Sequence, residues 1–290
     1  TFNMGVFMLK LVILIIYFAV LIGIGLYCRK HATDVNGFVL GGRSVGPWLT
    51  AFAYGTSYFS AVVFVGYAGQ FGWKYGIAAT WAGIGNAIIG SLLAWVVLGR
   101  RTRIMSQHLD SATMPQYFGK RFGSNPLKIG ASVIIFIFLI PYTASLYNGL
   151  SRLFGMAFNI DYSVCIIIMA TLTAIYVIAG GYMATAINDF IQGIIMLFGI
   201  VAVIAAVIHS KGGFMSALQG LANVSDPAVS DTPGIFASFF GPDPFNLLCV
   251  VILTSLGTWG LPQMVQKFYA IDNEASIQKG TVISTIFALI

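Results

Sequence analysis

The sequence predicts an all-α membrane protein that crosses the lipid bilayer several times. Of its 290 residues, 58% are hydrophobic and only 8% are charged, and the mean hydropathy is +0.88. A soluble globular domain carries roughly 25% charged residues. This chain therefore cannot cover a water-facing surface with polar side chains, and its solvent must largely be lipid. Its hydrophobic residues fall into long runs without a period-two alternation, which favours helices.

Eight apolar segments account for most of the chain. Each interior one approaches the roughly 20 residues that a helix needs to cross the hydrocarbon core. The expected spans are 6–28, 46–70, 76–98, 129–158, 162–180, 187–209, 235–260 and 276–290. The first run lacks a basic leader and a small-residue cleavage site, so we interpret it as a span rather than a signal peptide. The sequence stops inside the last run, and we expect the chain to be a fragment that is truncated there.

The net charge of +6 does not indicate nucleic-acid binding, because the basic residues lie in short loops between apolar runs. If the spans alternate in direction, eleven basic residues face one side of the membrane. They are Arg29, Lys30, Arg43, Arg100, Arg101, Arg103, Lys120, Arg121, Lys128, Lys267 and Lys279. The other side receives Lys10, Lys74, Arg152 and Lys211. The positive-inside rule then predicts an outside N-terminus and a cytoplasmic 100–128 loop in a cell inner (cytoplasmic) membrane.

The second span carries a cluster of small and polar residues at its centre, between Gly55 and Ser60. Glycine weakens a helix, and serine and threonine compete for backbone hydrogen bonds. In transporters, helices broken near the midplane offer carbonyl groups to a cation and amide groups to a substrate. The alternative is that small residues here only let membrane helices pack closely.

The seventh span carries a second interruption, with Gly257, Gly260 and Pro262 close together. A kink or an unwound stretch is expected there, and a simple proline kink is the alternative. The two interrupted spans lie five spans apart, as corresponding helices of a five-helix repeat would. Such paired interruptions point to a binding site near the bilayer midplane.

An acidic residue, Asp189, lies at the start of the sixth span without a nearby lysine or arginine in the sequence. It shares a helix face with Gln192. An ionisable group at membrane depth indicates a functional site. The alternative is a carboxylate that only stabilises the helix N-terminus.

Other residue types suggest no covalent chemistry. Tyr142 in the fourth span could line a cavity or simply pack in the bundle. The three cysteines lack metal-ligand spacing and are expected to be small buried hydrophobic residues. The histidines lie in loops or at span ends, so no transition-metal site and no cofactor is expected. The sequence contains no phosphate-binding loop or nucleophile elbow, and we predict that the protein is not an enzyme.

Four sequence motifs, in the same order as the spans, carry a resemblance to a known family. They are Gly37-Phe-Val-Leu-Gly-Gly-Arg-Ser-Val-Gly-Pro47, Met114-Pro-Gln-Tyr-Phe-Gly-Lys-Arg-Phe122, Gly180-Gly-Tyr-Met-Ala-Thr-Ala-Ile-Asn-Asp-Phe-Ile-Gln192 and Pro262-Gln-Met-Val-Gln-Lys-Phe268. With them the chain resembles the sodium:solute symporter family over nearly its whole length, and most of all the bacterial sodium/proline symporter branch.

The resemblance implies a LeuT-type inverted-repeat helical bundle with one extra N-terminal helix. On that interpretation, 1–290 is a single transmembrane domain. Residues 6–28 form the extra helix, 46–209 form the first five-helix repeat, and 235–290 begin a second repeat that is incomplete.

The resemblance also implies one sodium site, with main-chain carbonyl ligands that match Thr56 and Phe59. Asp189 resembles the family's aspartate on the cytoplasmic sodium path. The implied substrate-binding residues lie around the two interruptions: Ser57, Ser60, Tyr142, Thr254, Thr258 and Pro262. The chain departs from proline symporters at Tyr58, where they carry an aspartate. It departs again at Thr254 and Thr258, where they carry aromatic residues.

The function predicted from these features is sodium-coupled uptake of a small organic solute, such as an amino acid, by alternating access. Its partners would be the solute, the sodium ion as coupling ion and the lipid bilayer. Three alternatives remain open at this point: a symporter-like sensory membrane domain of a signalling protein, a proton-coupled transporter, and a channel.

Overall fold

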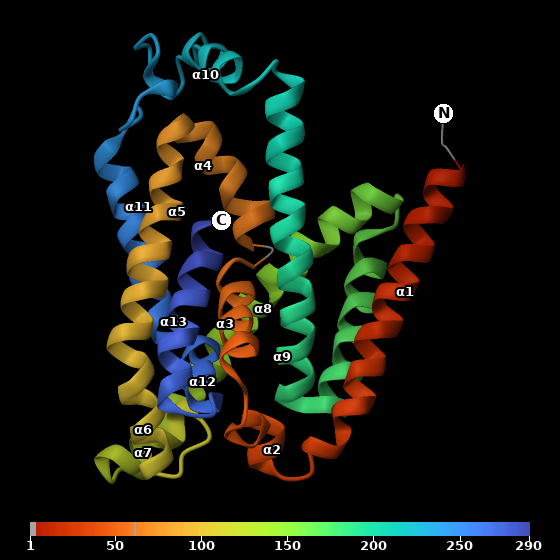
Figure 1. The fold of residues 1–290 in the computed structure, drawn as a ribbon, viewed down its shortest axis with the longest axis vertical. Coiled ribbons are helices and arrows are strands. Elements are labelled where there is room, and N and C mark those ends of the chain that lie inside the picture. Colours follow the sequence, from red (N-terminus) through yellow and green to blue (C-terminus); the bar gives the residue numbers. More distant parts are fainter. Residues whose placement is uncertain (1–3, 61) are drawn as a thin grey trace.

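The computed structural model describes residues 4–60 and 62–290, and these residues fold almost entirely into helices (Figure 1). The α-helices are α1 (Met4–Cys28), α2 (Val35–Leu40), α3 (Pro47–Tyr58), α4 (Ala68–Tyr75), α5 (Thr80–Gly85), α6 (Arg100–His108), α7 (Met114–Phe122), α8 (Asn125–Phe158), α9 (Tyr162–Ser210), α10 (Phe214–Ala222), α11 (Pro244–Leu256), α12 (Pro262–Ala270) and α13 (Glu274–Leu289). Short 3₁₀ or π-helical elements join them: η1 (Arg29–His31), η2 (Gly41–Arg43), η3 (Val62–Tyr67), η4 (Gly76–Ala79), η5 (Asn86–Leu93), η6 (Trp95–Gly99), η7 (Ile235–Ala237) and η8 (Gly257–Gly260).

Four helical stretches in the described part of the chain are long and apolar enough to cross a membrane. They are Phe7–Cys28, Ala68–His108, Asn125–Phe158 and Tyr162–Ser210. A fifth span forms if Pro244–Gly260 and Pro262–Ala270, which meet at a bend of 52°, are counted as one. The prediction of an all-α membrane protein with several spans is therefore confirmed.

The helix α9 contains two of the predicted spans, because it turns back on itself at Gly181. That residue has φ 57° and ψ −149°, a conformation that essentially only glycine adopts. A Cβ atom there would also lie 2.8 Å from the Phe38 carbonyl oxygen of α2. In Figure 1 both limbs of α9 rise from this turn at the lower end, so the chain runs down the first limb and up the second. Between the expected spans 162–180 and 187–209, Gly181 is thus the one residue of α9 with a non-helical conformation.

The seventh span begins later than expected. The prediction placed its start at 235, but residues 235–237 form a short 3₁₀ turn and the helix α11 starts at Pro244. Proline is favoured in the first turn of a helix, and the Asp243 carboxylate accepts a hydrogen bond from Asn246 N at 3.0 Å. Gly241, just before this start, has φ 68°, a backbone conformation that favours glycine.

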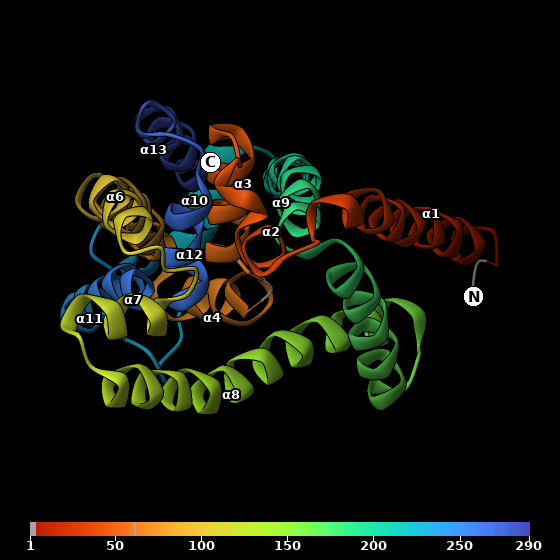
Figure 2. The ribbon, with the colours of Figure 1, turned by 90° about the horizontal axis from the view of Figure 1, so that it is seen from below.

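Helices α1 and α8 lie at the edge of the structure and are inclined to most of the others. Figure 2 looks from below Figure 1 and shows both of them largely side-on. Their outward faces are apolar, as expected of helices that contact lipid; exposed examples on α8 are Val133, Phe136 and Phe138. Helix α1 packs on α9 through glycines, because a Cβ atom on Gly180 would lie 2.6 Å from the Gly25 carbonyl oxygen.

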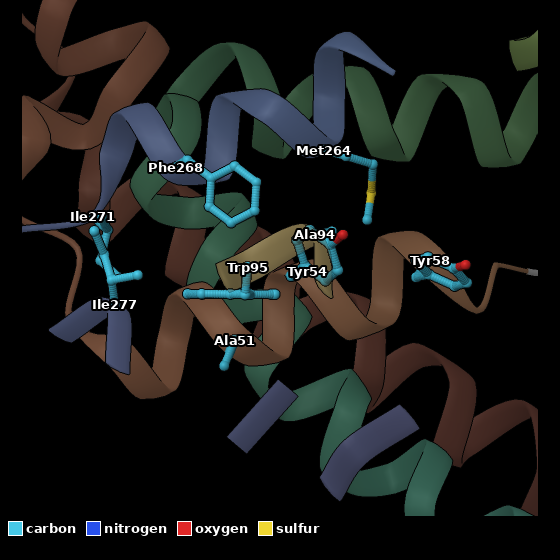
Figure 3. Close-up of a cluster of buried hydrophobic side chains, with 9 residues drawn as sticks. All are labelled: Ala51, Tyr54, Tyr58, Ala94, Trp95, Met264, Phe268, Ile271 and Ile277. Atoms are coloured by element: carbon cyan, nitrogen blue, oxygen red, sulfur yellow. The ribbon is translucent and has the colours of Figure 1, made fainter. Parts of the chain in front are cut away.

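The main buried cluster joins segments that are far apart in the sequence. In Figure 3, the rings of Tyr54, Trp95 and Phe268 pack together between α3, η6 and α12. The remaining members are Ala51, Tyr58, Ala94, Met264, Ile271 and Ile277. The cluster therefore fixes α3 against the bent pair α11–α12 and against the start of α13.

The predicted cytoplasmic loops gather at one end of the molecule. In Figure 1, α2, α6, α7 and the turn of α9 lie at the lower end, and α10 lies at the upper end. Arg43 binds this end together: its guanidinium donates to the carbonyl oxygens of Ser106, Ser111 and Tyr269 and to Ser106 Oγ, at 2.8 to 3.3 Å. Arg103 adds hydrogen bonds to the Ile271 and Asp272 carbonyls.

Candidate functional site

The first interruption is a real break at the end of α3. The helical hydrogen bonding of α3 ends where Phe59 N donates to the Gly55 carbonyl at 2.9 Å, and Phe59 itself has non-helical angles of φ −92° and ψ 62°. Helical structure resumes at Val62. The helix thus extends through most of the polar cluster and breaks at its far end, because Gly55 and Thr56 are still accommodated in the last turn.

Thr56 lies in that last turn, where main-chain carbonyls have no amide partner within the helix. Its hydroxyl donates to the Phe52 carbonyl of its own helix at 2.9 Å, so the side chain is turned away from the break. Two tight contacts surround it. A Cβ atom on Gly193 of α9 would lie 3.1 Å from the Thr56 methyl group, and the Phe287 ring of α13 lies over Gly55. Both α9 and α13 therefore hold the turn that ends at the break.

The second interruption separates α11 from α12. Helix α11 tightens into the 3₁₀ turn η8 at Gly257, and the chain then becomes extended at Leu261 before Pro262 opens α12. The expected kink is confirmed by the 52° bend at this point. The hydroxyls of Thr254 and Thr258 donate to the Val250 and Ser255 carbonyls of their own segment, at 2.9 and 3.0 Å.

A buried polar bridge connects the two breaks. The Tyr58 hydroxyl, at the end of α3, lies 2.9 Å from Asn86 Oδ1 of η5 and 3.1 Å from the Thr254 carbonyl oxygen of α11. Ser255 Oγ donates to the same Asn86 oxygen at 2.9 Å. The sequence prediction did not include Asn86 or Ser255. Asn86 could have been found in the sequence, because its polar amide interrupts the apolar run 76–98. Nothing in the sequence marks Ser255 in this way.

The other predicted substrate residues are only partly brought together. Ser57 and Ser60 are half-buried at the α3 break. Tyr142 is half-buried on α8, which packs on η3, α7 and α9. No hydrogen bond or ring contact joins Tyr142 to α11 or η8 among the residues that the structure describes. A cavity of about 130 Å³ behind α3 is lined by Trp48, Phe52 and Phe287 together with Leu197, Ile283, Ile286 and Ile290. None of the predicted substrate residues lines it.

Asp189, which has no lysine or arginine near it in the sequence, has a cationic partner in the fold. Its Oδ2 atom lies 3.6 Å from Lys267 Nζ of α12, and the lysine is almost fully buried. Lys267 also lies over the Tyr182 ring, 5.2 Å from its centroid. The sequence could not reveal this ion pair, because the partner is on another helix far along the chain.

Close to this pair, the Arg43 guanidinium donates to the carbonyl of Tyr269, two residues after Lys267. Burial and the nearby charge of Arg103 lower the pKa of Arg43. An arginine keeps its charge even so. Four neutral oxygen atoms accept hydrogen bonds from its guanidinium and so solvate the positive charge.

The described residues contain no group of three or more histidine, cysteine or acidic side chains that could hold a metal ion. Cys28 and Cys165 are buried, as expected, whereas Cys249 is exposed on α11. The expectation of three buried cysteines is therefore wrong for Cys249, which lies on an outer face of the apolar helix.

Comparisons with known proteins show one family. Residues 38–290 match the sodium:solute symporter family. The chain is 31% identical over 261 residues to the osmoregulated proline transporter OpuE of Bacillus subtilis, an alignment that covers 89% of this chain and 51% of that protein. It is 32% identical over 282 residues to a sodium/proline symporter of Staphylococcus aureus, covering 92% of this chain and 51% of that protein. The chain spans about half the length of these curated relatives. The family and the relatives are transporters and not enzymes, which confirms that prediction.

Proposed function

This chain belongs to the sodium:solute symporter family, and we propose that it forms about half of a sodium-coupled transporter for a small organic solute. The solute would be taken up across the cytoplasmic membrane by alternating access. Proline, which appears in the names of both relatives, is the first candidate. At Tyr58, Thr254 and Thr258 the chain differs from the residues that proline symporters carry. Other small neutral amino acids should therefore be tested alongside proline.

The observation that carries this proposal is the pair of broken helices held against each other. The α3 break at Phe59 and the α11–α12 bend at Leu261 are separate in sequence, yet the Tyr58 hydroxyl connects them directly. In secondary transporters, coupling ions and substrates bind where two discontinuous helices expose backbone groups near the midplane. A LeuT-type inverted repeat, with 6–28 as an extra helix and 46–209 as the first repeat, is the architecture that we propose for this arrangement.

Sodium would bind at the α3 break, with the Thr56 and Phe59 carbonyl oxygens as ligands. Sodium is a hard cation for which main-chain oxygens are suitable ligands. The contacts of Gly193 and Phe287 with the last turn of α3 support this assignment, because they restrain the carbonyl groups that the ion would need. The substrate would lie between the two breaks, near Ser57, Ser60, Thr254, Thr258 and Pro262, with Tyr142 approaching in a different conformational state.

Asp189 would line the route between the sodium site and the cytoplasm. In this structure its carboxylate is paired with Lys267, so a sodium ion on this route would compete with the lysine ammonium for the same oxygen atoms. Arg43 and Arg103 close the same end of the molecule. We therefore assign this conformation to a state that is closed on the cytoplasmic side, with the N-terminus outside and the 100–128 loop in the cytoplasm.

The test is uptake of labelled L-proline and a panel of small amino acids by the full-length protein in liposomes. Accumulation should require an inward sodium gradient and should collapse when a sodium ionophore dissipates it. Accumulation driven only by a proton gradient would replace sodium as the coupling ion. Absence of uptake for every solute, with or without sodium, would favour the sensory-domain alternative, and single-channel currents would favour a channel.

A further inference from the structure

We propose that Tyr58 is a positioning residue that transmits the state of the α3 break to the α11–α12 break. This inference rests on the proposed function, since it explains how an ion at one break would order the other. The observation is one hydroxyl group that lies within hydrogen-bonding distance of Thr254 O and Asn86 Oδ1, on two other segments.

The two ends of this connection lie directly at the breaks. Tyr58 is the last residue of α3, immediately before the non-helical Phe59. On the other side, the α-helical hydrogen bonds of α11 end where Gly257 N donates to the Leu253 carbonyl. Thr254 supplies the next carbonyl along the chain. Thr254 O is therefore the first carbonyl of α11 that accepts no regular α-helical hydrogen bond. The Tyr58 hydroxyl takes the place of the amide donor that a continuing helix would supply there.

The surroundings of the hydroxyl leave it little freedom. Tyr58 is buried, and its ring packs against Tyr54 and Phe59. A Cβ atom on Gly90 of η5 would overlap with the Tyr58 hydroxyl, so the glycine provides the space that it occupies. The neighbouring Tyr54 hydroxyl donates to the Gly90 carbonyl at 2.9 Å. A shift of the last turn of α3 must consequently move this hydroxyl relative to Thr254 or carry Thr254 with it.

Asn86 shares its oxygen between two hydroxyls, which supplies a matched comparison. The Tyr58 hydroxyl lies within hydrogen-bonding distance of both Asn86 Oδ1 and the Thr254 carbonyl and shares its single proton between them, whereas Ser255 Oγ donates to Asn86 Oδ1. Removing the Ser255 hydroxyl weakens the same buried network but keeps the direct contact between the Tyr58 hydroxyl and the Thr254 carbonyl. Tyr58→Phe removes the link and keeps the ring. A purely structural role predicts similar effects for both variants, whereas a positioning role predicts a difference.

The decisive experiment uses sodium alone as the probe, so that the solute need not be known. Hydrogen exchange is measured on the full-length protein in nanodiscs, with sodium chloride or choline chloride, for peptides that cover 54–60 and 254–261. In the unmodified protein, sodium should slow exchange at both peptides by about fivefold or more. Ser255→Ala should behave in the same way. Tyr58→Phe should keep the sodium effect at 54–60 and lose it at 254–261.

A second readout tests the consequence for binding. In the unmodified protein, sodium should tighten L-proline binding by about tenfold, a typical coupling between two ligands. Tyr58→Phe should reduce that factor to about threefold or less with little change in sodium-free affinity. Gly90→Ala, which displaces the hydroxyl while the tyrosine remains, should act like Tyr58→Phe, and Gly83→Ala, where a Cβ meets nothing within 4 Å, should not.

The two proposals fail in different ways. If sodium changes exchange at neither peptide of the unmodified protein, the proposed sodium site is wrong. If sodium protects both peptides equally in Tyr58→Phe, the transmission through Tyr58 is wrong while the sodium site stands. An equal loss of the effect at 254–261 in Tyr58→Phe and Ser255→Ala would also overturn the positioning role, because it would show a general weakening of the network.

Discussion

The Asp189 carboxylate of α9 and the Lys267 ammonium of α12 face each other at 3.6 Å, and this ion pair connects the sixth predicted span to the segment after the second break. Lys267 is the more deeply buried of the two. Bringing such charges out of water is costly, so each partner compensates for the burial of the other.

Removing one member of this pair should destabilise the protein more than removing both. Asp189→Asn leaves a buried lysine uncompensated and should lower the free energy of unfolding by about 3 kcal/mol. The double variant Asp189→Asn with Lys267→Gln should recover much of that loss. Thermal unfolding of the full-length protein in detergent measures both effects. Additive losses in the double variant would show that the two side chains do not interact.

A different substitution at Asp189 tests its role in transport. Asp189→Ala should abolish sodium-dependent uptake if the carboxylate lines the ion route, whereas Asp161→Ala, at the exposed start of α9, should leave uptake unchanged. Initial rates in liposomes at several sodium concentrations provide the measurement. Unchanged sodium dependence in Asp189→Ala would remove that residue from the route.

The turn in α9 requires glycine at Gly181. Gly181→Ala forces a side chain into φ 57°, ψ −149° and toward the Phe38 carbonyl, so we expect a loss of roughly 1–3 kcal/mol in stability. Gly199→Ala in the same helix is the control, because a Cβ atom there meets nothing within 4 Å. Yield and melting temperature of both full-length variants can be compared directly. Equal behaviour would mean that the turn tolerates a side chain.

If the lower end is closed as proposed, the closure should depend on the planar shape of the Arg43 guanidinium. Lysine keeps the charge but lacks the planar fork that reaches Ser106, Ser111 and Tyr269 together. Arg43→Lys should therefore raise the rate at which a cysteine placed at Ser57 is labelled from the cytoplasmic side, by about tenfold, in a version without other cysteines. Arg101→Lys, on the exposed face of α6, is the control. Unchanged labelling in Arg43→Lys would show that other contacts keep this end closed.

The close packing of α1 on α9 can be tested by replacing glycines of α1 with a larger residue. Gly25 lies so close to Tyr176 that a Cβ atom would be 2.9 Å from its backbone, whereas Gly23 has open space around it. Gly25→Leu should separate α1 from α9 and lower the melting temperature, because close approach through small residues stabilises membrane helix pairs. Gly23→Leu should have little effect. A similar response of both variants would indicate that α1 does not depend on this crossing.

Sequence alone predicted those features that depend on local chemistry. Apolar run length indicated the spans, and Gly257, Gly260 and Pro262 indicated the bend, since these residues limit what the backbone can do wherever they stand. The polar cluster between Gly55 and Ser60 indicated the α3 break, which lies at Phe59, near the end of that cluster. Gly55 and Thr56 remained helical because contacts from Gly193 and Phe287 hold them, and the sequence does not reveal those contacts.

The rest depends on tertiary packing. The sequence does not reveal the partner of Asp189, because Lys267 is remote in the chain and lies in a segment predicted to be a loop. Asn86 was passed over as one polar residue in an apolar run, and its importance emerges only when Tyr58 and Ser255 converge on it. The start of α11 was misplaced because the apolar residues at 235–240 continue the hydropathy of the helix, although Gly241 and Pro244 set its true beginning.

Helix α8 has a consequence for the membrane around the protein. With 34 residues it is about 50 Å long, well beyond the roughly 30 Å of a hydrocarbon core, and it lies obliquely at the periphery. An inclined helix of this length accommodates a thinner bilayer by leaning further and a thicker one by standing more upright. Because α8 also packs on η3, just after the α3 break, the acyl-chain length of the surrounding lipid would act on the same region as the proposed sodium site.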